Sequence, residues 1–241
     1  MSAFVLKCIA LATMLIDHLG YIGQMNSSRE GFYIMRGIGR VAMPIYMFLI
    51  AQGCRRTRNA KKYLFTLLLF AFISEIPFDL IFQNAGPVYP GRPLTVFFWQ
   101  SQNVMFTLFL GAASVIAFDK IKQTKAYMLC LLPLAACAFL AIFMYTDYSW
   151  IGVVGIFILS LAKNKWQLFA AMAAVIILLR INSYSMLFVV FTGIALLLVM
   201  LYNGKRGPSF KWGFYLSYPV HLLLYAVGWI WWIGPYLYNI R

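Results

Sequence analysis

Ionisable side chains stand inside apolar segments of this sequence. The stretch MLIDHLGYIG, residues 14–23, places Asp17 beside His18 near the end of an apolar run that begins at Phe4. The chain has only two histidines and six acidic residues, so one of each falls in this run. Histidine takes up and releases protons near neutral pH and is the side chain used most often as a general acid or base. His18 is therefore the first candidate for acid–base chemistry.

Two further pairs of charged residues occur in the apolar runs that follow. Arg36 and Arg40 are four residues apart, as are Glu75 and Asp79, so each pair lies on one face of a helix. Short loops join these runs, so the arginines are expected to neutralise the carboxylates. The pairs are then either an ion-paired staple between helices or part of a functional site. The other candidate substrate contacts are Asp17, Arg36, Asn103, Thr107, Asp147, Tyr218 and His221.

The role of His221 stays open at this point, because a core histidine bonded to another helix explains it equally well. The sequence has no G-x-S-x-G or H-E-x-x-H motif. A direct transfer assisted by a general base is therefore favoured over a covalent intermediate. The four cysteines resemble neither a disulfide framework nor a zinc site, and no metal is expected.

Composition indicates which elements must position these residues. The chain has 241 residues, of which 63% are hydrophobic and 11% are charged, with a mean hydropathy of +0.81. Soluble domains are typically about 25% charged. We therefore expect an all-α integral membrane protein, folded as one domain over residues 1–241. The apolar runs predict nine helices, at 4–22, 33–54, 63–82, 102–118, 126–145, 149–162, 166–181, 184–202 and 212–232.

The basic residues predict the topology. The second, fourth, sixth and eighth loops hold five, three, two and three lysines and arginines, and every lysine lies in one of these loops or at position 7. The positive-inside rule then places the N-terminus and these loops in the cytoplasm and the C-terminus outside. Topology thus explains most of the net charge of +14, and no nucleic-acid role is inferred. The dipeptide at residues 17–18 falls on the outer side.

Six segments, in order, carry a resemblance to a known family. They are LKCIALATMLIDHLG, MRGIGRVAMPIYMFLIAQGCRRTRNAKKYL, LLFAFISEIPFDL, NVMFTLFLGA, DYSWIGV and YLSYPVHLLL. The chain resembles TraX-type integral membrane acetyltransferases over nearly its whole length, least in residues 120–145. The loop QNAGPVYPGRPLTVFFWQSQ departs from that pattern and is expected to shape the acceptor site.

The resemblance implies transfer of acetyl from cytosolic acetyl-CoA to an amine or hydroxyl outside the bacterial inner membrane. It implies His18 as the base, with Arg40, Glu75 and Asp79 as further catalytic residues. We expect Glu75 or Asp79 to orient His18, because Asp17 projects about 100° round its helix. Asn103, Arg36 or Arg40 would stabilise the oxyanion. The expected contacts to the CoA phosphates are Arg55, Arg56, Arg58, Lys61 and Lys62.

Several alternatives remain open. A small-molecule or proton-coupled transporter also uses buried histidine, carboxylate and arginine groups. A scaffold without catalytic activity would use them as structural ion pairs. The acceptor is a peptide, an amino sugar or a glycan, and homo-oligomerisation is possible.

Overall fold

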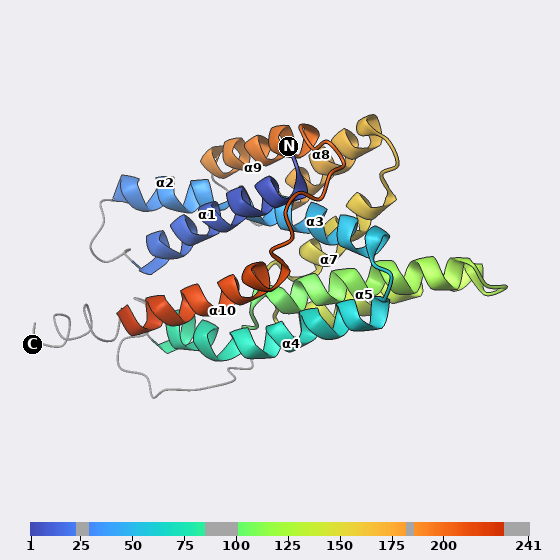
Figure 1. Ribbon diagram of the computed structural model, residues 1–241, viewed down its shortest axis with the longest axis horizontal. Coiled ribbons are helices and arrows are strands. Elements are labelled where there is room, and N and C mark those ends of the chain that lie inside the picture. Colours follow the sequence, from blue (N-terminus) through green and yellow to red (C-terminus); the bar gives the residue numbers. More distant parts are fainter. Residues whose placement is uncertain (23–28, 85–100, 182–185, 229–241) are drawn as a thin grey trace, which may run out of the picture.

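The computed structural model of the protein describes residues 1–22, 29–84, 101–181 and 186–228, and these residues form a bundle of helices (Figure 1). No strand occurs within these ranges. The helices are α1 (Ala3–Ile22), α2 (Arg29–Gly39), α3 (Ala42–Arg56), α4 (Ala60–Asp79), α5 (Val104–Lys122), α6 (Leu132–Phe143), α7 (Ser149–Leu161), α8 (Lys165–Ile181), α9 (Met186–Met200) and α10 (Lys211–Gly228). A π-helical segment, η2 (Leu80–Asn84), continues α4, and a short 3-10 turn, η3 (Tyr127–Leu129), precedes α6.

The helices have the length and composition of membrane segments. Four candidate spans are long and apolar enough to cross a bilayer: Ala3–Ile22, Glu30–Arg56, Ala60–Phe82 and Val104–Lys122. Large apolar side chains face outward, among them Phe65, Phe139 and Leu224. Such a surface is stable in lipid, where apolar side chains need no cover. The prediction of an all-helical membrane protein is confirmed at this level.

Helix α3 lies at the centre of the bundle. It packs against α1, α5, α7, α8 and α9, and α5 in turn packs against α4, α6 and α7. Helix α10 lies along α4 and also contacts α1 (Figure 1). The first and last described helices are therefore neighbours, which brings together residues about two hundred positions apart.

The expected helix 33–54 is broken at Arg40. Pro44 has no N–H to donate to the carbonyl of Arg40, and its ring crowds that carbonyl. The backbone instead tightens, so that the N–H of Arg40 donates to the carbonyl of Gly37 at 2.9 Å. Helix α2 ends at Gly39 and α3 begins at Ala42. The break places Arg40 at a junction between two helices.

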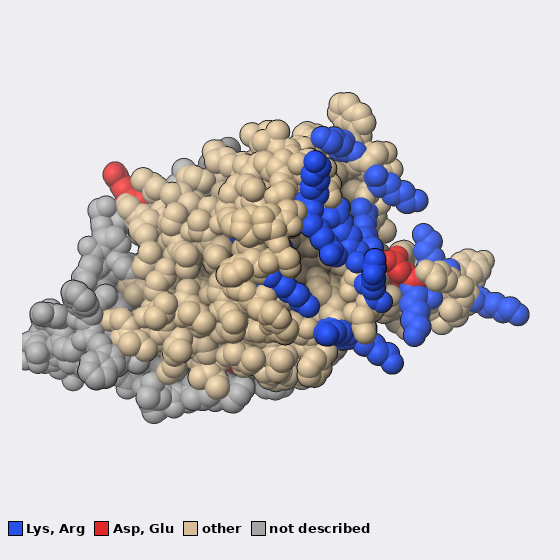
Figure 2. Space-filling view, viewed as in Figure 1, with Lys and Arg blue, Asp and Glu red and all other residues tan. Residues whose placement is uncertain are grey.

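Lysines and arginines gather at one end of the bundle (Figure 2). We call this end the basic end; it carries the connections that follow α3, α5, α7 and α9. His18 and Glu75 lie toward the opposite end of their helices, and Arg40 lies at the junction just before α3. The predicted acceptor loop lies largely outside the described residues, because residues 85–100 are not among them.

Candidate active site

A cavity of about 440 Å³ opens among the helix ends opposite the basic end. We call it the His18 cavity. Its wall is formed by residues of α1, α2, α3 and α10, by the end of α4 with η2, by the start of α5 and by the loop before α7. Its charged and histidine side chains are Asp17, His18, Arg36, Arg40 and Asp147, with Tyr148 and Tyr218 beside them. The structure thus collects into one cavity six of the residues predicted for catalysis or substrate binding.

The partner of His18 is the second histidine. His18 Nδ1 lies 2.7 Å from His221 Nε2, and His221 Nδ1 lies 2.7 Å from the carbonyl oxygen of Ser217. The hydroxyl of Tyr225, one turn after His221 on α10, donates to the carbonyl of Leu15 on α1 at 3.3 Å. Contact between α1 and α10 therefore creates the histidine pair. His221 itself is buried and does not line the cavity.

Asp17 binds Arg36 within the same wall. Arg36 Nη1 donates to Asp17 Oδ2 at 2.5 Å, and both side chains are largely buried. A Cβ atom on Gly39 would collide with the Asp17 side chain. Glycine at position 39 is thus needed for α2 to approach α1 at this point. The expectation that Arg36 pairs with Glu75 or Asp79 is replaced by a pair with Asp17.

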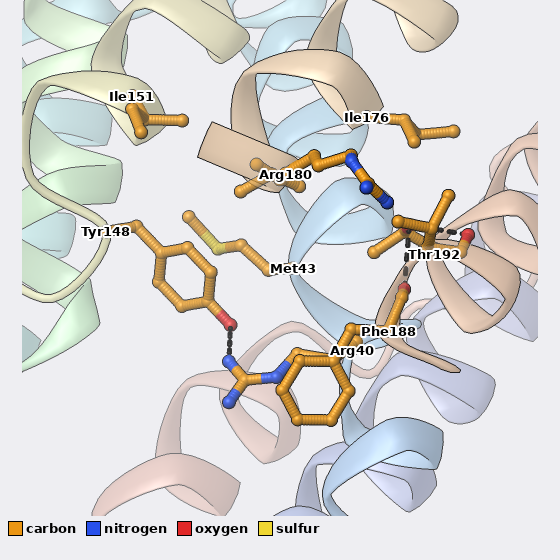
Figure 3. Close-up of a pocket in the computed structure, with 10 residues that line it drawn as sticks. Arg40, Met43, Tyr148, Ile151, Ile176, Arg180, Phe188 and Thr192 are labelled. Atoms are coloured by element: carbon orange, nitrogen blue, oxygen red, sulfur yellow. Dashed lines mark hydrogen bonds between the residues drawn. The ribbon is translucent and has the colours of Figure 1, made fainter. Parts of the chain in front are cut away.

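Arg40 lies between two cavities. Its Nη1 donates to the hydroxyl of Tyr148 at 3.1 Å, and its guanidinium lies 4.9 Å from the ring centre of Phe188 (Figure 3). It lines both the His18 cavity and a smaller side cavity of about 120 Å³. Arg180 also lines this side cavity (Figure 3). Arg40 is therefore held by an aromatic hydroxyl and an aromatic face.

Glu75 does not orient His18 in this structure. It is fully buried, and its Oε2 accepts from the backbone N–H of Asn103 at 3.2 Å and from Asn103 Nδ2 at 2.5 Å. Asn103 also caps α5 by accepting from the N–H of Met105. Glu75 and Asn103 thus tie α4 to the start of α5. Asp79, one turn further on, is also fully buried and lines none of the cavities described here.

Thr107 supports a strained loop beside the cavity. Its hydroxyl donates to the carbonyl of Asp147 and lies 2.9 Å from the Thr146 hydroxyl oxygen, within hydrogen-bond distance. Tyr145, Tyr148 and Ser149 have φ values of 51°, 62° and 44°. Each such non-glycine residue costs about 1–3 kcal/mol, and such strain clusters at functional sites. The strained loop brings Asp147 and Tyr148 into the cavity wall.

A second cavity, of about 460 Å³, lies toward the basic end. We call it the basic cavity. Its cations are Lys7, Arg56, Arg206 and Lys211, and its described lining has no carboxylate. Lys7 lies 5.1 Å from the ring centre of Phe214, and Lys211 lies 5.5 Å from that of Trp212. Within the described ranges, no group of three or more His, Cys, Asp or Glu side chains could hold a metal ion.

The five cations predicted to contact CoA have different surroundings. Arg56 lines the basic cavity and donates to the carbonyl of Gly204 at 2.8 Å. Arg58 lines only an open groove beside this cavity, and Arg56 lines that groove as well. Arg55 donates to the carbonyls of Ser160 and Ala162, at the end of α7. These bonds give Arg55 a structural role. Lys61 and Lys62 lie exposed on the first turn of α4 and line neither cavity.

Tyr46 on α3 lines both the basic cavity and the His18 cavity. The two cavities therefore meet at one side chain in the middle of the bundle. Sequence reasoning missed Tyr46, because an aromatic residue in an apolar helix looks like ordinary core. It also passed over Tyr148, although DYSWIGV had been singled out. Lys7 was likewise missed, because a single lysine in the first helix resembles a topology signal.

The fold defines the class of the protein: a helical membrane protein with two cavities that meet at a partly buried tyrosine. The chain belongs to the TraX protein family, whose model matches residues 2–227. It is also 30% identical over 243 residues to a protein of Dichelobacter nodosus described as "Probable fimbrial assembly protein FimC, serogroup H1". That match covers 92% of this chain and 93% of the relative. No solved structure matches the chain significantly.

Proposed function

We propose that the protein transfers an acetyl group across the bacterial cytoplasmic membrane. Acetyl-CoA would bind at the basic end, on the cytoplasmic side, and an amine or hydroxyl acceptor would bind in the His18 cavity, on the outer side. The observation that carries this proposal is the pair of cavities that meet at Tyr46. One has a cationic rim, and the other holds a histidine with a hydrogen-bonded partner.

The basic cavity has the chemistry of a CoA site. CoA joins a polyphosphorylated nucleotide to a long, mostly uncharged arm that ends in a thiol. Arg56, Arg206 and Lys211 would bind the phosphates, because guanidinium and ammonium groups form charge-assisted hydrogen bonds with them. Leu49, Leu67 and other apolar residues of the same lining would cover the arm. The thioester would then reach Tyr46.

The His18 cavity would supply the base. His18 takes a proton from the acceptor as its nitrogen or oxygen attacks the acetyl carbonyl carbon, so the new C–N or C–O bond forms. Arg40, held in place by the Tyr148 hydroxyl, lies on the same wall and would stabilise the charge that develops on the carbonyl oxygen. The C–S bond then breaks, CoA leaves as the thiolate, and His18 returns the proton to it.

The relative's description suggests a class of acceptor. That protein is described as a probable fimbrial assembly protein. A polypeptide with an unmodified N-terminus offers a free α-amine, which is a suitable nucleophile for direct transfer. Amino sugars and hydroxyls of surface glycans are the alternative acceptors with the same attack chemistry.

A transporter is the second candidate function. Two cavities on opposite sides of a single side chain also suit a solute that is passed across the bilayer. The transporter would show flux through liposomes and no dependence on acetyl-CoA. The transferase would release free CoA thiol in proportion to acetylated acceptor.

Ligand-induced stabilisation separates these functions in purified protein. CoA at about 100 times its Kd should stabilise the folded state by about 2.7 kcal/mol. We expect CoA and acetyl-CoA to raise the unfolding temperature in detergent, and pantetheine, which lacks the nucleotide, to raise it much less. An unfolding temperature unchanged by saturating acetyl-CoA would contradict the transferase.

A further inference from the structure

Three hydrogen-bonding groups from α1 and α10 form a chain that ends at the His18 cavity. The carbonyl oxygen of Ser217 contacts His221 Nδ1, and His221 Nε2 contacts His18 Nδ1, each at 2.7 Å. His18 lines the cavity, whereas His221 and Ser217 lie behind it. The chain therefore runs from the interior of α10 to the reactive side chain.

The direction of every bond in this chain follows from its first member. A carbonyl oxygen only accepts, so His221 Nδ1 carries a hydrogen. In a neutral ring the other nitrogen has a lone pair, so His221 Nε2 accepts from His18 Nδ1. A neutral His18 that donates through Nδ1 has its lone pair on Nε2. That nitrogen is the one left to act on a ligand in the cavity.

Ring geometry agrees with a strong bond between the two histidines. The ring planes differ by 13° and the centroids are 5.0 Å apart. That separation exceeds the nitrogen–nitrogen distance by about one ring diameter, so the rings meet edge to edge in a common plane. Phe82 and Tyr218 pack against His18 with their rings at 76° and 61° to it. The imidazole of His18 is thus fixed in orientation.

We propose that His221 is a positioning residue that fixes the tautomer of His18 and shares its proton during transfer. Imidazole in water favours the tautomer protonated on Nε2, which would leave no base facing the acceptor. The bond to His221 reverses that preference. When His18 Nε2 takes the acceptor proton, the His18 Nδ1–H strengthens its bond to His221 Nε2, and the positive charge spreads over both rings. His18 returns to its neutral form, protonated only on Nδ1, when its Nε2 gives the proton to the departing CoA thiolate.

This inference rests on the proposed transferase for its catalytic part, but the tautomer can be measured without any turnover. The chain has only two histidines, so nitrogen-15 labelling of histidine gives signals from two rings. At a pH where both rings are neutral, we expect Nδ1 of each to be protonated and Nε2 of each to be unprotonated. A neutral His18 protonated on Nε2 would overturn the inference directly.

Variants at position 221 test the consequence for catalysis. His221→Leu removes the acceptor, so His18 should revert to the Nε2–H tautomer and kcat should fall about tenfold or more, with KM for acetyl-CoA little changed. His221→Gln retains a carbonyl that can accept from His18 Nδ1, so it should recover part of both properties. Leu224→Ala, at an outward-facing position on the same helix, is the matched control and should leave the His18 tautomer and kcat unchanged.

The two possible failures give different results. If His221→Leu leaves kcat and the His18 nitrogen shifts as in the wild type, the positioning role of His221 is wrong. If the wild type shows both predicted tautomers and transfers no acetyl group to any acceptor, the proposed function fails and the histidine pair stands as a structural one.

Discussion

The His18 cavity and the basic cavity differ in how their charges are balanced. In the His18 cavity Arg36 is bound to Asp17, Arg40 to Tyr148 and His18 to His221. In the basic cavity, Arg56 contacts a backbone carbonyl and the ring of Tyr202, and Lys7 and Lys211 contact aromatic rings. No carboxylate belongs to its described lining.

This difference suggests two kinds of site. The first resembles a reaction site, in which the protein supplies the partners that hold each polar group in place. The second resembles a binding site for a polyanion, in which the ligand supplies the negative charge. Removing a group from the first should impair chemistry or folding, whereas removing a cation from the second should weaken ligand binding and leave the free protein nearly as stable.

The largest effect is expected from His18→Ala. Loss of a general base typically lowers a rate by about 10²–10⁴-fold, so acetyl transfer should fall by that factor. Binding of CoA at the other cavity should persist, and the unfolding temperature should rise with CoA as in the wild type. Radiolabelled acetyl transfer, measured beside thermal unfolding, checks both statements. A folded variant that transfers acetyl at the wild-type rate would remove His18 from the mechanism.

Paired neutralisation in the basic cavity should come next. Charge-assisted hydrogen bonds contribute about 1.5–3 kcal/mol each, so Arg56→Gln with Arg206→Gln should raise the Kd for CoA at least tenfold. The readout is the CoA concentration needed for a given rise in unfolding temperature. Lys163→Gln is the matched control, because Lys163 is exposed at the basic end and lines neither cavity. Equal loss of affinity in the control would mean that the effect is general charge attraction.

Substitution of Gly39 should lower the stability of the folded protein at the His18 cavity without removing any polar group. In Gly39→Ala the new methyl meets the Asp17 side chain, and forced overpacking typically costs about 1–3 kcal/mol. Reversible unfolding in mild detergent would measure this loss. Gly193→Ala on α9 is the control, because a Cβ there has no neighbour within 4 Å. Equal stability of the two variants would contradict the close approach of α2 to α1.

Tyr148→Phe should have the smallest effect. It removes one hydrogen bond from Arg40, and a single net hydrogen bond contributes about 0.5–1.5 kcal/mol. We expect a severalfold loss of kcat, an unchanged response to CoA and a small drop in unfolding temperature. Tyr33→Phe, at an exposed tyrosine on α2, serves as the control. A large change in CoA affinity would mean that the two cavities are not separate in function.

Much of the fold was readable from apolar runs. Each predicted helix overlaps a helix of the structure, because membrane segments need long uninterrupted apolar stretches. The break at Arg40 was overlooked, although Pro44, four residues later, carried the signal. The sidedness of the basic loops remains a prediction, since orientation depends on a bilayer and not on the packing of the helices.

The sequence predicted which residues belong to the site better than it predicted the contacts between them. His18, Arg40 and Asp17 were found because charged groups in apolar runs are conspicuous. The bond from His18 to His221 joins residues 203 positions apart and depends on packing between α1 and α10, which no local pattern encodes. Glu75 was predicted to orient His18, because a carboxylate is the usual partner of a catalytic histidine. In the structure, Asn103 binds Glu75 instead.

Sealed proteoliposomes test the separation of the two cavities most directly. Radiolabelled acetyl-CoA would be placed on the side where the loops of the basic end are accessible to protease, and an envelope extract on the other side. We predict labelled acetyl on acceptor material, with the CoA moiety kept on the first side and no transfer by His18→Ala. Passage of intact acetyl-CoA through the vesicles, or labelling of acceptor only when both substrates share one side, would contradict transfer across the membrane.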